Sequence, residues 1–436
     1  MNRGCGLHRD GASPSCSSCR RRSIPVGEFD TYREQVAMNE RSFVQALGRL
    51  SLLIILAPGL MVAGCGSLSR PMIDTVSAPA PPREFSSLKR FRFVADNAEQ
   101  SMAFMQTWNA DRQRAGQASI TALAISGGGA NGAFGAGVLV GWSRSGNRPE
   151  FDLVTGVSTG ALIAPMAFAG KYWDSRLVLG YRSAGAAQLT ERGLGMLIRP
   201  SIYSGEPLAA LVERYTSAAL LQAIADQHCQ GRRLLVATTN LDTQETHIWD
   251  MGAIALSARE EGNAQQALAL FRTIMTASAS VPGVFPPIPI ADGDTSEIHA
   301  DGGVNTPFML LPEALVQWQI KQPGLMPGKI FIIINSPMAP RSNRLDGGAV
   351  AIMSRSFDSL SRANLRMHLA MATAFAHRHN VQLRYAALPS DIDADPLDFG
   401  AARMAVLFDL GVGRYTELTQ GDDIVPMAGN SSNDGQ

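Results

Sequence analysis

A cluster of glycines constrains this chain more than any other feature. Residues 126–137 contain six glycines in twelve positions, and they follow the apolar run of residues 119–126. Glycine loses more backbone freedom on folding than other residues, so such a cluster indicates a backbone whose conformation or close contacts exclude side chains. The pattern predicts a strand that leads into a tightly built loop. Three occupants suit such a loop: the phosphates of a cofactor, a lipid, or a charge that forms only during a reaction.

Further apolar segments predict the rest of the sheet. Residues 151–157, 232–240 and 328–335 are short, rich in β-branched side chains and bounded by turn residues, as buried strands are. Helical stretches, such as residues 206–227, lie between them. Strands that alternate with helices predict an α/β domain with a largely parallel central sheet flanked by helices.

Two nucleotide-binding interpretations of the glycine loop are weak. A Walker-type loop ends in Gly-Lys-Ser/Thr, and residues 90–170 contain no lysine. Gly127, Gly129 and Gly132 match the dinucleotide pattern G-x-G-x-x-G. The acidic residue that this pattern requires should follow the second strand, whereas Asp152 precedes it. The match therefore rests on glycine spacing alone.

A second motif favours the third occupant. Gly156, Ser158 and Gly160 form G-x-S-x-G between an apolar strand and an apolar helix, which is the context of a nucleophile elbow. The sharp turn needs small neighbours and places the serine at a helix N-terminus, where the helix dipole favours negative charge. Attack by a serine on an ester produces an oxyanion, which requires N–H donors close by. Consecutive glycines can aim successive N–H groups at one point, so the loop is interpreted as the oxyanion hole.

Ordered sequence blocks then identify a resemblance. Residues 126–139, 156–160, 278–287 and 300–307 resemble patatin-like phospholipases in content and order, and the resemblance covers about residues 119–420. It implies a patatin-like α/β fold and a serine acyl hydrolase that cleaves acyl esters of membrane lipids. It also implies that Ser158 is the nucleophile, that Asp301 is its catalytic partner, and that no histidine, metal or cofactor takes part. The glycines that it assigns are Gly127, Gly128 and Gly129 in the oxyanion hole, and Gly132, Gly156, Gly160, Gly302 and Gly303 in the motifs.

The chain departs from the family pattern at two positions of the glycine loop. Asn131 stands where a basic residue is frequent, and Ser126 replaces a frequent acidic residue. A missing positive charge weakens the expectation of tight binding to a head-group phosphate. It does not affect the expectation of ester cleavage.

Two other functions remain open at this stage. An α/β-hydrolase-type esterase would use a Ser-His-Asp triad, and the histidines that follow Asp301 are His368, His377 and His379. These three lie in a helical pattern rather than in a loop after a strand, which favours ordinary helix positions. The other function is a non-catalytic envelope protein that binds lipid.

Charge and the N-terminal segment define the expected surroundings. The formal net charge is zero, so the electrostatic pattern of a nucleic-acid-binding protein is missing. Residues 1–37 are polar and of low complexity, and Met38 is a candidate start. Residues 38–64 have the basic, apolar and small-residue regions of a secretory signal, and Cys65 follows as in the lipobox of bacterial lipoproteins. We therefore expect a lipid anchor at Cys65 and the outer membrane of a bacterial envelope, then a tether and leading helix over 65–118, the catalytic domain over 119–420 and a disordered tail over 421–436.

Overall fold

The computed structural model describes a large part of the chain in detail. The described residues are 88–117, 119–183, 205–260, 262–293, 295–310, 327–339, 349–392 and 394–420. By its contacts the chain divides into Met1–Cys65 and Gly66–Gln436, and all described residues lie in the second unit. The predictions for residues 1–37, 38–64, Cys65 and 421–436 lie outside the described residues.

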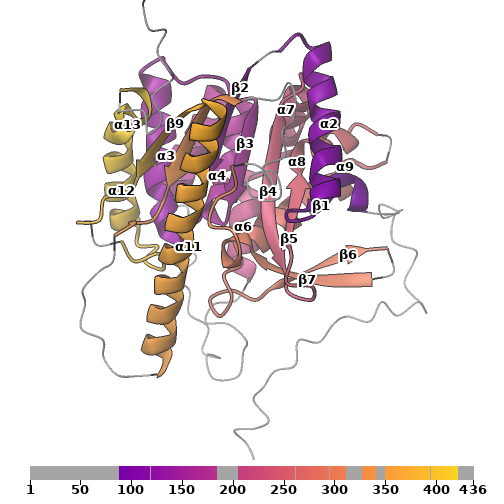
Figure 1. Ribbon diagram of the computed structural model, residues 1–436. Coiled ribbons are helices and arrows are strands. Elements are labelled where there is room, and N and C mark those ends of the chain that lie inside the picture. Colours follow the sequence, from indigo (N-terminus) through magenta and orange to yellow (C-terminus); the bar gives the residue numbers. More distant parts are fainter. Residues whose placement is uncertain are drawn as a thin grey trace, which may run out of the picture. The chain divides into compact units, whose positions relative to one another are not determined.

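A nine-stranded mixed sheet forms the framework (Figure 1). The strands are β1 (Arg92–Val94), β2 (Ile120–Ile125), β3 (Leu153–Val157), β4 (Arg233–Asn240), β5 (Thr246–Asp250), β6 (Ile288–Asp292), β7 (Thr295–Asp301), β8 (Pro327–Ile334) and β9 (Gln382–Ala387). Their main order is β1-β5-β4-β3-β2-β8-β9, and β7 joins β4 and β6 outside this path. The pairs from β4 through β3, β2 and β8 to β9 are parallel, whereas the pairs that involve β1, β5, β6 and β7 are antiparallel. The predicted α/β fold with a largely parallel central sheet is confirmed, and its four predicted strands are β2, β3, β4 and β8.

Helices cover both faces of this sheet. They are α2 (Ala98–Arg114), α3 (Gly132–Arg144), α4 (Thr159–Ala169), α5 (Asp174–Leu177), α6 (Glu206–Tyr215), α7 (Ala218–Cys229), α8 (Met251–Ser257), α9 (Ala264–Ser278), α11 (Ala349–His379), α12 (Ala401–Arg414) and α13 (Thr416–Thr419). Helices α2 and α11 pack on one face of the sheet, and α3, α4, α7, α8, α9 and α12 pack on the other. Each face has its own apolar cluster. Strand β2 shows why: Leu123 and Ile125 join one cluster, while Ala122 and Ala124 join the other, as alternation along a strand requires.

Two predicted helical stretches differ in detail. Residues 88–97 precede α2 and form a short 3-10 turn (Leu88–Phe91) and strand β1, which pairs antiparallel with β5. Helix α2 begins only after Asn97, whose side chain accepts a hydrogen bond from Gln100 N at 3.0 Å. The stretch 206–227 is divided into α6 and α7, because Ser217 caps a new helix by accepting from Leu220 N. Among the described helices, none is long and apolar enough to cross a membrane.

Strands β2, β3 and β8 run in the same direction, so their carboxyl ends meet at one edge of the sheet. The glycine loop follows β2, Ser158 follows β3, and Asn335 follows β8. Strand β7 brings Asp301 beside β4, where it pairs with Thr238. The fold therefore gathers four separate segments of the chain at this edge, which we call the catalytic edge.

Candidate active site

Ser158 occupies the turn between β3 and α4 in a strained conformation. Its φ is 57° and its ψ is −127°, a combination that side-chain-bearing residues rarely adopt and that costs roughly 1–3 kcal/mol. Two hydrogen bonds through Ser278 stabilise the turn. Ser158 N donates to Ser278 Oγ at 3.1 Å, and that hydroxyl donates to Ala237 O at 2.7 Å. A Cβ at Gly156 would lie 2.5 Å from Gly160 O, so this part of the elbow requires glycine. The local geometry is that of a nucleophile elbow.

Asp301 ends β7 with a buried carboxyl group beside Ser158. Its Oδ1 accepts a hydrogen bond from Gly303 N at 2.7 Å, and its Oδ2 is buried without a hydrogen-bond partner of regular geometry among the described residues. Burial raises the pKa of Asp301 from 3.8 to about 7, although hydrogen bonds from the Ser158 hydroxyl and Gly303 N–H act in the opposite direction. A carboxyl group with a pKa near neutral pH can accept and return a proton, as a general base must.

The glycine loop lies beside Ser158, because a Cβ at Gly127 would lie 3.0 Å from Ser158 Cβ. Gly127 N donates to Pro307 O at 3.1 Å, so its N–H is already engaged. Gly128 and Gly129 have φ values of 153° and 57°, and no atom of the described residues accepts from their N–H groups. Ala130 N donates to Pro396 O at 2.8 Å, which fixes the loop on its outer side. Among the described residues, the N–H groups of Gly128 and Gly129 are therefore the ones in this loop without an acceptor, whereas those of Gly127 and Ala130 are engaged.

Asn335 anchors the glycine loop, and the sequence analysis did not identify it. Its backbone N donates to Ser126 Oγ at 2.8 Å, its Nδ2 donates to Ser126 O at 2.8 Å, and its Oδ1 accepts from Gly135 N at 2.9 Å. The side chain is fully buried. A polar residue directly after an apolar strand was the available signal, because parallel strands end at the same edge as the loop. Ser278, the support of the elbow, carried no such signal.

The other motif residues have packing roles. Gly132 begins α3 against the side chain of Thr159, and a Cβ at Gly302 would lie 2.5 Å from Ala237 O. The N–H of Gly303 binds Asp301. Asn131, at the position that is often basic in the family, is buried and donates to Ala394 O at 3.4 Å. Its amide therefore contacts the backbone of a neighbouring loop.

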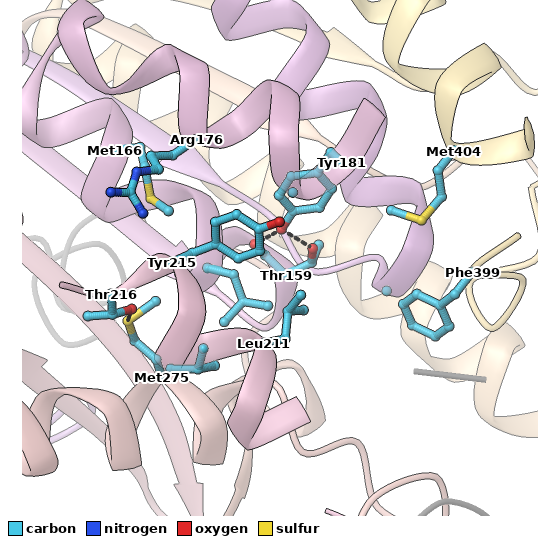
Figure 2. Close-up of a pocket in the computed structure, with 14 residues that line it drawn as sticks. Thr159, Met166, Arg176, Tyr181, Leu211, Tyr215, Thr216, Met275, Phe399 and Met404 are labelled. Carbon is cyan, nitrogen blue, oxygen red and sulfur yellow. Dashed lines mark hydrogen bonds between the residues drawn. The ribbon is translucent and has the colours of Figure 1, made fainter. Parts of the chain in front are cut away.

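An apolar pocket adjoins the elbow (Figure 2). It contains about 530 Å³ of atom-free space, part of it open to solvent. Its lining residues are Gly129, Thr159, Leu162, Met166, Arg176, Gly180, Tyr181, Leu211, Val212, Tyr215, Thr216, Met275, Phe399 and Met404. Gly129 belongs to the glycine loop and Thr159 follows Ser158, so one end of the pocket lies next to the candidate catalytic residues. The phenol oxygen of Tyr181 lies 2.9 Å from Thr159 Oγ1, and burial of this group raises the pKa of Tyr181.

A polar cluster links β5 and β7. His247, Glu297 and His299 place their ligand-type atoms within 4.8 Å of one another, an arrangement that could hold a metal ion. Arg92 already supplies a cation there: its Nη1 lies 2.5 Å from Glu297 Oε2 and 3.3 Å from His247 Nδ1. Its Nη2 donates to Asp292 Oδ2 at 2.8 Å. The cluster is therefore complete as an ion-pair network within the protein.

The histidines and the acidic residue of the alternative interpretations lie elsewhere. His368, His377 and His379 are part of α11, as expected for ordinary helix positions. In the described part of the chain, no histidine hydrogen-bonds to Ser158 or Asp301. Asp152 precedes β3, accepts from Thr121 N at 2.7 Å and pairs with Arg112 at 3.0 Å. It therefore lies at the edge of the sheet opposite to the glycine loop.

Known proteins resemble this chain in sequence and in structure. The sequence model of the family described as "Patatin-like phospholipase" matches residues 123–312, a range that includes the glycine loop, Ser158 and Asp301. Among solved structures, VipD from Legionella pneumophila is similar, with 14% sequence identity and a TM-score of 0.36. The alignment covers 69% of this chain and 66% of VipD, slightly less than two thirds of that protein. No curated protein matches this chain.

Proposed function

This chain belongs to the patatin-like phospholipase family through residues 123–312, and from that premise we propose that it cleaves acyl esters of membrane lipids with a Ser158–Asp301 dyad. Membership of this family implies lipid acyl hydrolase activity. The finer proposal is a phospholipase or lysophospholipase whose oxyanion hole is the glycine loop. The single observation that supports it most is the strained Ser158 beside a buried carboxyl group whose pKa is about 7.

The first half of the proposed reaction forms an acyl-enzyme. Ser158 Oγ attacks the ester carbonyl carbon while the Asp301 carboxylate accepts the hydroxyl proton. The carbonyl oxygen becomes an oxyanion, which the N–H groups of Gly128 and Gly129 stabilise. When the bond to the leaving alkoxide breaks, Asp301 returns the proton to it and the alcohol departs. The carbonyl carbon is then bound to Ser158 Oγ.

The second half releases the fatty acid. Water attacks the acyl carbon, and the Asp301 carboxylate accepts a proton from it. A second oxyanion forms at Gly128 and Gly129 and collapses, the bond to Ser158 Oγ breaks, and the proton passes from Asp301 to the serine. In each half, the Asp301 carboxylate is unprotonated before the attack, protonated in the tetrahedral intermediate and unprotonated again after the collapse, which suits a pKa close to neutral pH.

The pocket beside the elbow supports an apolar acyl group in the substrate. Hydrocarbon surface comes from Leu162 on α4. It also comes from Leu211 on α6, Phe399 in the loop before α12 and Met404 on α12 (Figure 2). Burial of an alkyl chain there is favourable by about 0.8 kcal/mol for each CH₂ group. The pocket begins at Gly129 and Thr159, so a chain inside it would place its ester end near Ser158.

The two alternative functions make different demands. A Ser-His-Asp triad needs an imidazole close to Ser158, whereas the hydrogen-bonding partners of Ser158 among the described residues are Ser278, Ala161 and Asp301. A non-catalytic lipid-binding protein gains nothing from a strained serine and a carboxyl group with a raised pKa, both of which reduce stability. Both features favour the dyad enzyme.

Product analysis tests the proposal. The full chain is incubated with mixed envelope lipids, and the products are identified by mass spectrometry beside a Ser158→Ala control. We expect free fatty acids and deacylated lipids from the parent protein only. Equal products from Ser158→Ala, or labelling of that variant by a fluorophosphonate probe, would remove Ser158 from the mechanism. A parent protein that neither releases products nor reacts with the probe would favour lipid binding without catalysis.

We also propose that Cys65 carries the lipid anchor and that the protein resides at the outer membrane. The support is the sequence of residues 38–65, with its basic start, apolar run and small residues before the cysteine. Cys65→Ser should move the protein from the membrane fraction to the soluble fraction, while hydrolysis of a short soluble ester stays unchanged. The anchor is contradicted if the Cys65→Ser protein stays in the membrane fraction and Cys65 of the parent protein carries no acyl group.

A further inference from the structure

Helix α11 is much longer than the strands beside it. Its 31 residues span about 46 Å at roughly 1.5 Å per residue. The eight residues of β8 span about 26 Å at roughly 3.3 Å per residue. Helix α11 ends at His379 and β9 starts at Gln382, so helix and sheet are level at that end. The excess of about 20 Å therefore lies at the catalytic edge, and Figure 1 shows the orange helix extending beyond the strands.

Two side chains mark where α11 passes the catalytic edge. Asn364 Nδ2 donates to the backbone O of Asn305 at 2.9 Å, and Asn305 lies four residues after Asp301 in the chain. Arg362 Nη1 donates to Pro337 O at 2.8 Å, in the segment that follows β8. These bonds fix the helix at residues 362–364. The turns before them, from residue 349 to residue 361, extend outward from the edge that carries Ser158.

The outer face of this helix is apolar. Ile352, Leu360 and Met367 are 47%, 71% and 56% exposed, and they account for three of the seven large apolar side chains that are exposed in the described part of the chain. Their spacings of eight and seven residues place them on one side of the helix. Ser356 and Ala363, which are also exposed, lie between them. A continuous uncharged stripe therefore starts beyond the catalytic edge and runs back along the helix.

Basic side chains flank this stripe. Between residues 352 and 367 the helix carries three arginines against one acidic residue, Asp358. Arg362 is buried and pairs with Asp358 at 3.0 Å, whereas the side chains of Arg355 and Arg366 reach the surface. Arg366 is exposed, and its Nη1 also donates to Met338 O at 3.1 Å. Apolar side chains on one face with arginines beside them are the pattern of a helix that lies in the plane of a membrane surface.

We infer that the outer face of α11, formed by Ile352, Leu360 and Met367, binds the surface of a lipid bilayer that contains anionic headgroups. The three apolar side chains enter the headgroup layer, and the excess positive charge of the helix is attracted to the anionic lipids. The inference rests on the proposed function, because it supplies the contact that brings the catalytic edge to its substrate. It concerns binding, so it can be tested separately from hydrolysis.

The test compares two exposed apolar positions. The full chain carries Ser158→Ala and Cys65→Ser, so neither turnover nor an anchor at Cys65 contributes, and it is floated with vesicles of phosphatidylcholine and phosphatidylglycerol. Leu360→Glu should weaken vesicle binding about tenfold, because a side chain that enters the apolar layer becomes charged. The matched control is Val406→Glu on α12, where Val406 is 66% exposed and lies outside the outer face of α11. It should leave binding unchanged.

A local probe gives a readout that the rest of the chain cannot mask. All native cysteines are replaced by serine, Leu360→Cys or Val406→Cys is introduced, and a polarity-sensitive dye is attached. Addition of vesicles should raise and blue-shift the emission at position 360 but not at position 406. Equal responses at the two positions would overturn the inference, as would no response at position 360. The inference would also be overturned if light scattering showed a dimer of the parent protein and a monomer of Leu360→Glu, because the face would then bind a second copy of the chain.

The outcomes also separate this inference from the proposed function. Position 360 can respond to vesicles although the parent protein releases no lipid product, which would refute the hydrolase and retain the binding face. Leu360→Glu should retain the parent rate on a short soluble ester and lose rate only on vesicle lipids. A parental rate on both substrates, together with an unresponsive dye, refutes the binding face and retains the hydrolase.

Discussion

At the scale of single residues, the Ser158–Asp301 pair combines two unfavourable features. Ser158 holds a backbone conformation that few side-chain-bearing residues adopt, and Asp301 is a carboxyl group buried far from water. Burial raises the pKa of Asp301 to about 7, so the group can exchange protons near neutral pH. The same burial makes its charged form expensive in the folded protein. The pair therefore links activity and stability through one ionisation.

The first prediction concerns the pH dependence of turnover. The proposed mechanism needs the ionised form of Asp301, so kcat/KM should rise as pH increases and level off above an apparent pKa of about 7. Asp301→Asn should lower kcat roughly 100- to 10,000-fold, the usual contribution of a general base. Rates on a soluble ester over roughly pH 5–9 supply the measurement. His368→Ala, His377→Ala and His379→Ala are the controls. If one of these three substitutions abolished the pH dependence of kcat/KM, the base would be that histidine instead.

The second prediction concerns stability and follows from the same pKa. A folded-state pKa raised from 3.8 to about 7 means that the folded protein binds this proton more tightly than the unfolded chain does. The free energy of unfolding therefore falls as pH rises from about 4 to about 7, and stays reduced above that. Asp301→Asn removes the buried charge, so it should raise Tm at pH 8, with a smaller effect at pH 5. A lower Tm for Asp301→Asn at pH 8 contradicts this account of the carboxyl group.

At the scale of elements, the glycine loop depends on three neighbouring segments. Asn335 after β8 holds its start, Pro307 accepts from Gly127 N, and Pro396 accepts from Ala130 N. A Cβ at Gly128 would lie 2.5 Å from Asn335 O, a backbone atom that cannot move without disturbing the sheet. The loop is therefore built in one conformation before any substrate arrives, as an oxyanion hole requires.

The third prediction tests that loop with a matched pair of glycines. Gly128→Ala should lower kcat about 100- to 1,000-fold with little change in KM, because an N–H donor turns away from a charge that forms only in the transition state. Its Tm should fall as well, because the added methyl group collides with Asn335. Gly146 also has a positive φ of 78°, but open space surrounds it. Gly146→Ala should lower stability by about 1 kcal/mol and leave kcat unchanged.

Steady-state kinetics and thermal melting of both glycine variants separate three roles of the loop. A dinucleotide loop predicts unchanged ester cleavage and lost cofactor affinity for Gly128→Ala. A purely structural loop predicts a lower Tm with kcat retained in the folded fraction. A folded Gly128→Ala protein with the kcat of Gly146→Ala would therefore refute the oxyanion hole.

The elements also show what local sequence signals can predict. Strands β2, β3, β4 and β8 are apolar over most of their length because both of their faces are covered, and such runs are recognisable alone. Strand β7 (Thr295–Asp301) and its partner β6 contain both polar and apolar residues, and only part of their side chains is buried. Neither strand therefore forms an apolar run that can be recognised in the sequence. Ser158 and the glycines were predictable from motifs of adjacent residues. Asn335 and Ser278 belong to no such motif, because their partners lie 209 and 120 residues away in the chain, and only the place of Asn335 after an apolar strand offered a signal.

At the scale of the whole molecule, Arg92 connects the edge of the sheet to the strand that carries Asp301. It comes from β1, and it binds Asp292 and Glu297 on the hairpin of β6 and β7. Burial alone would raise the pKa of Glu297, but hydrogen bonds from His299 and Arg92 and the charge of Arg92 lower it to about 2. Residues 88–94, which precede the first predicted strand, are thus an integral part of the sheet. Sequence patterns could not predict this, because β1 has only three residues.

The fourth prediction measures that connection. Arg92→Met leaves Glu297 without its cation, so it should lower the free energy of unfolding by roughly 1–3 kcal/mol at pH 7, less than for a fully buried pair. A quarter of the Glu297 side chain is exposed, which limits the effect. The loss should shrink as pH falls from about 4.5 toward about 2, where Glu297 becomes protonated in both variants. The control is Arg182→Met, whose pair with Asp409 is exposed, so its loss should change the free energy of unfolding little. Equal losses for the two variants would contradict the role of Arg92.

The apolar pocket has a consequence for protein engineering. Its wall comes from side chains such as Leu162, Leu211 and Met404, which belong to three different helices and make no contribution to the proposed chemistry. A library restricted to such positions can vary the depth of the cavity while Ser158 and its supports stay intact. We expect Leu211→Trp to shift the preferred substrate toward shorter acyl chains, with the rate on an acetyl ester retained. Fatty-acid chain length thus becomes a trait that can be selected without rebuilding the catalytic machinery.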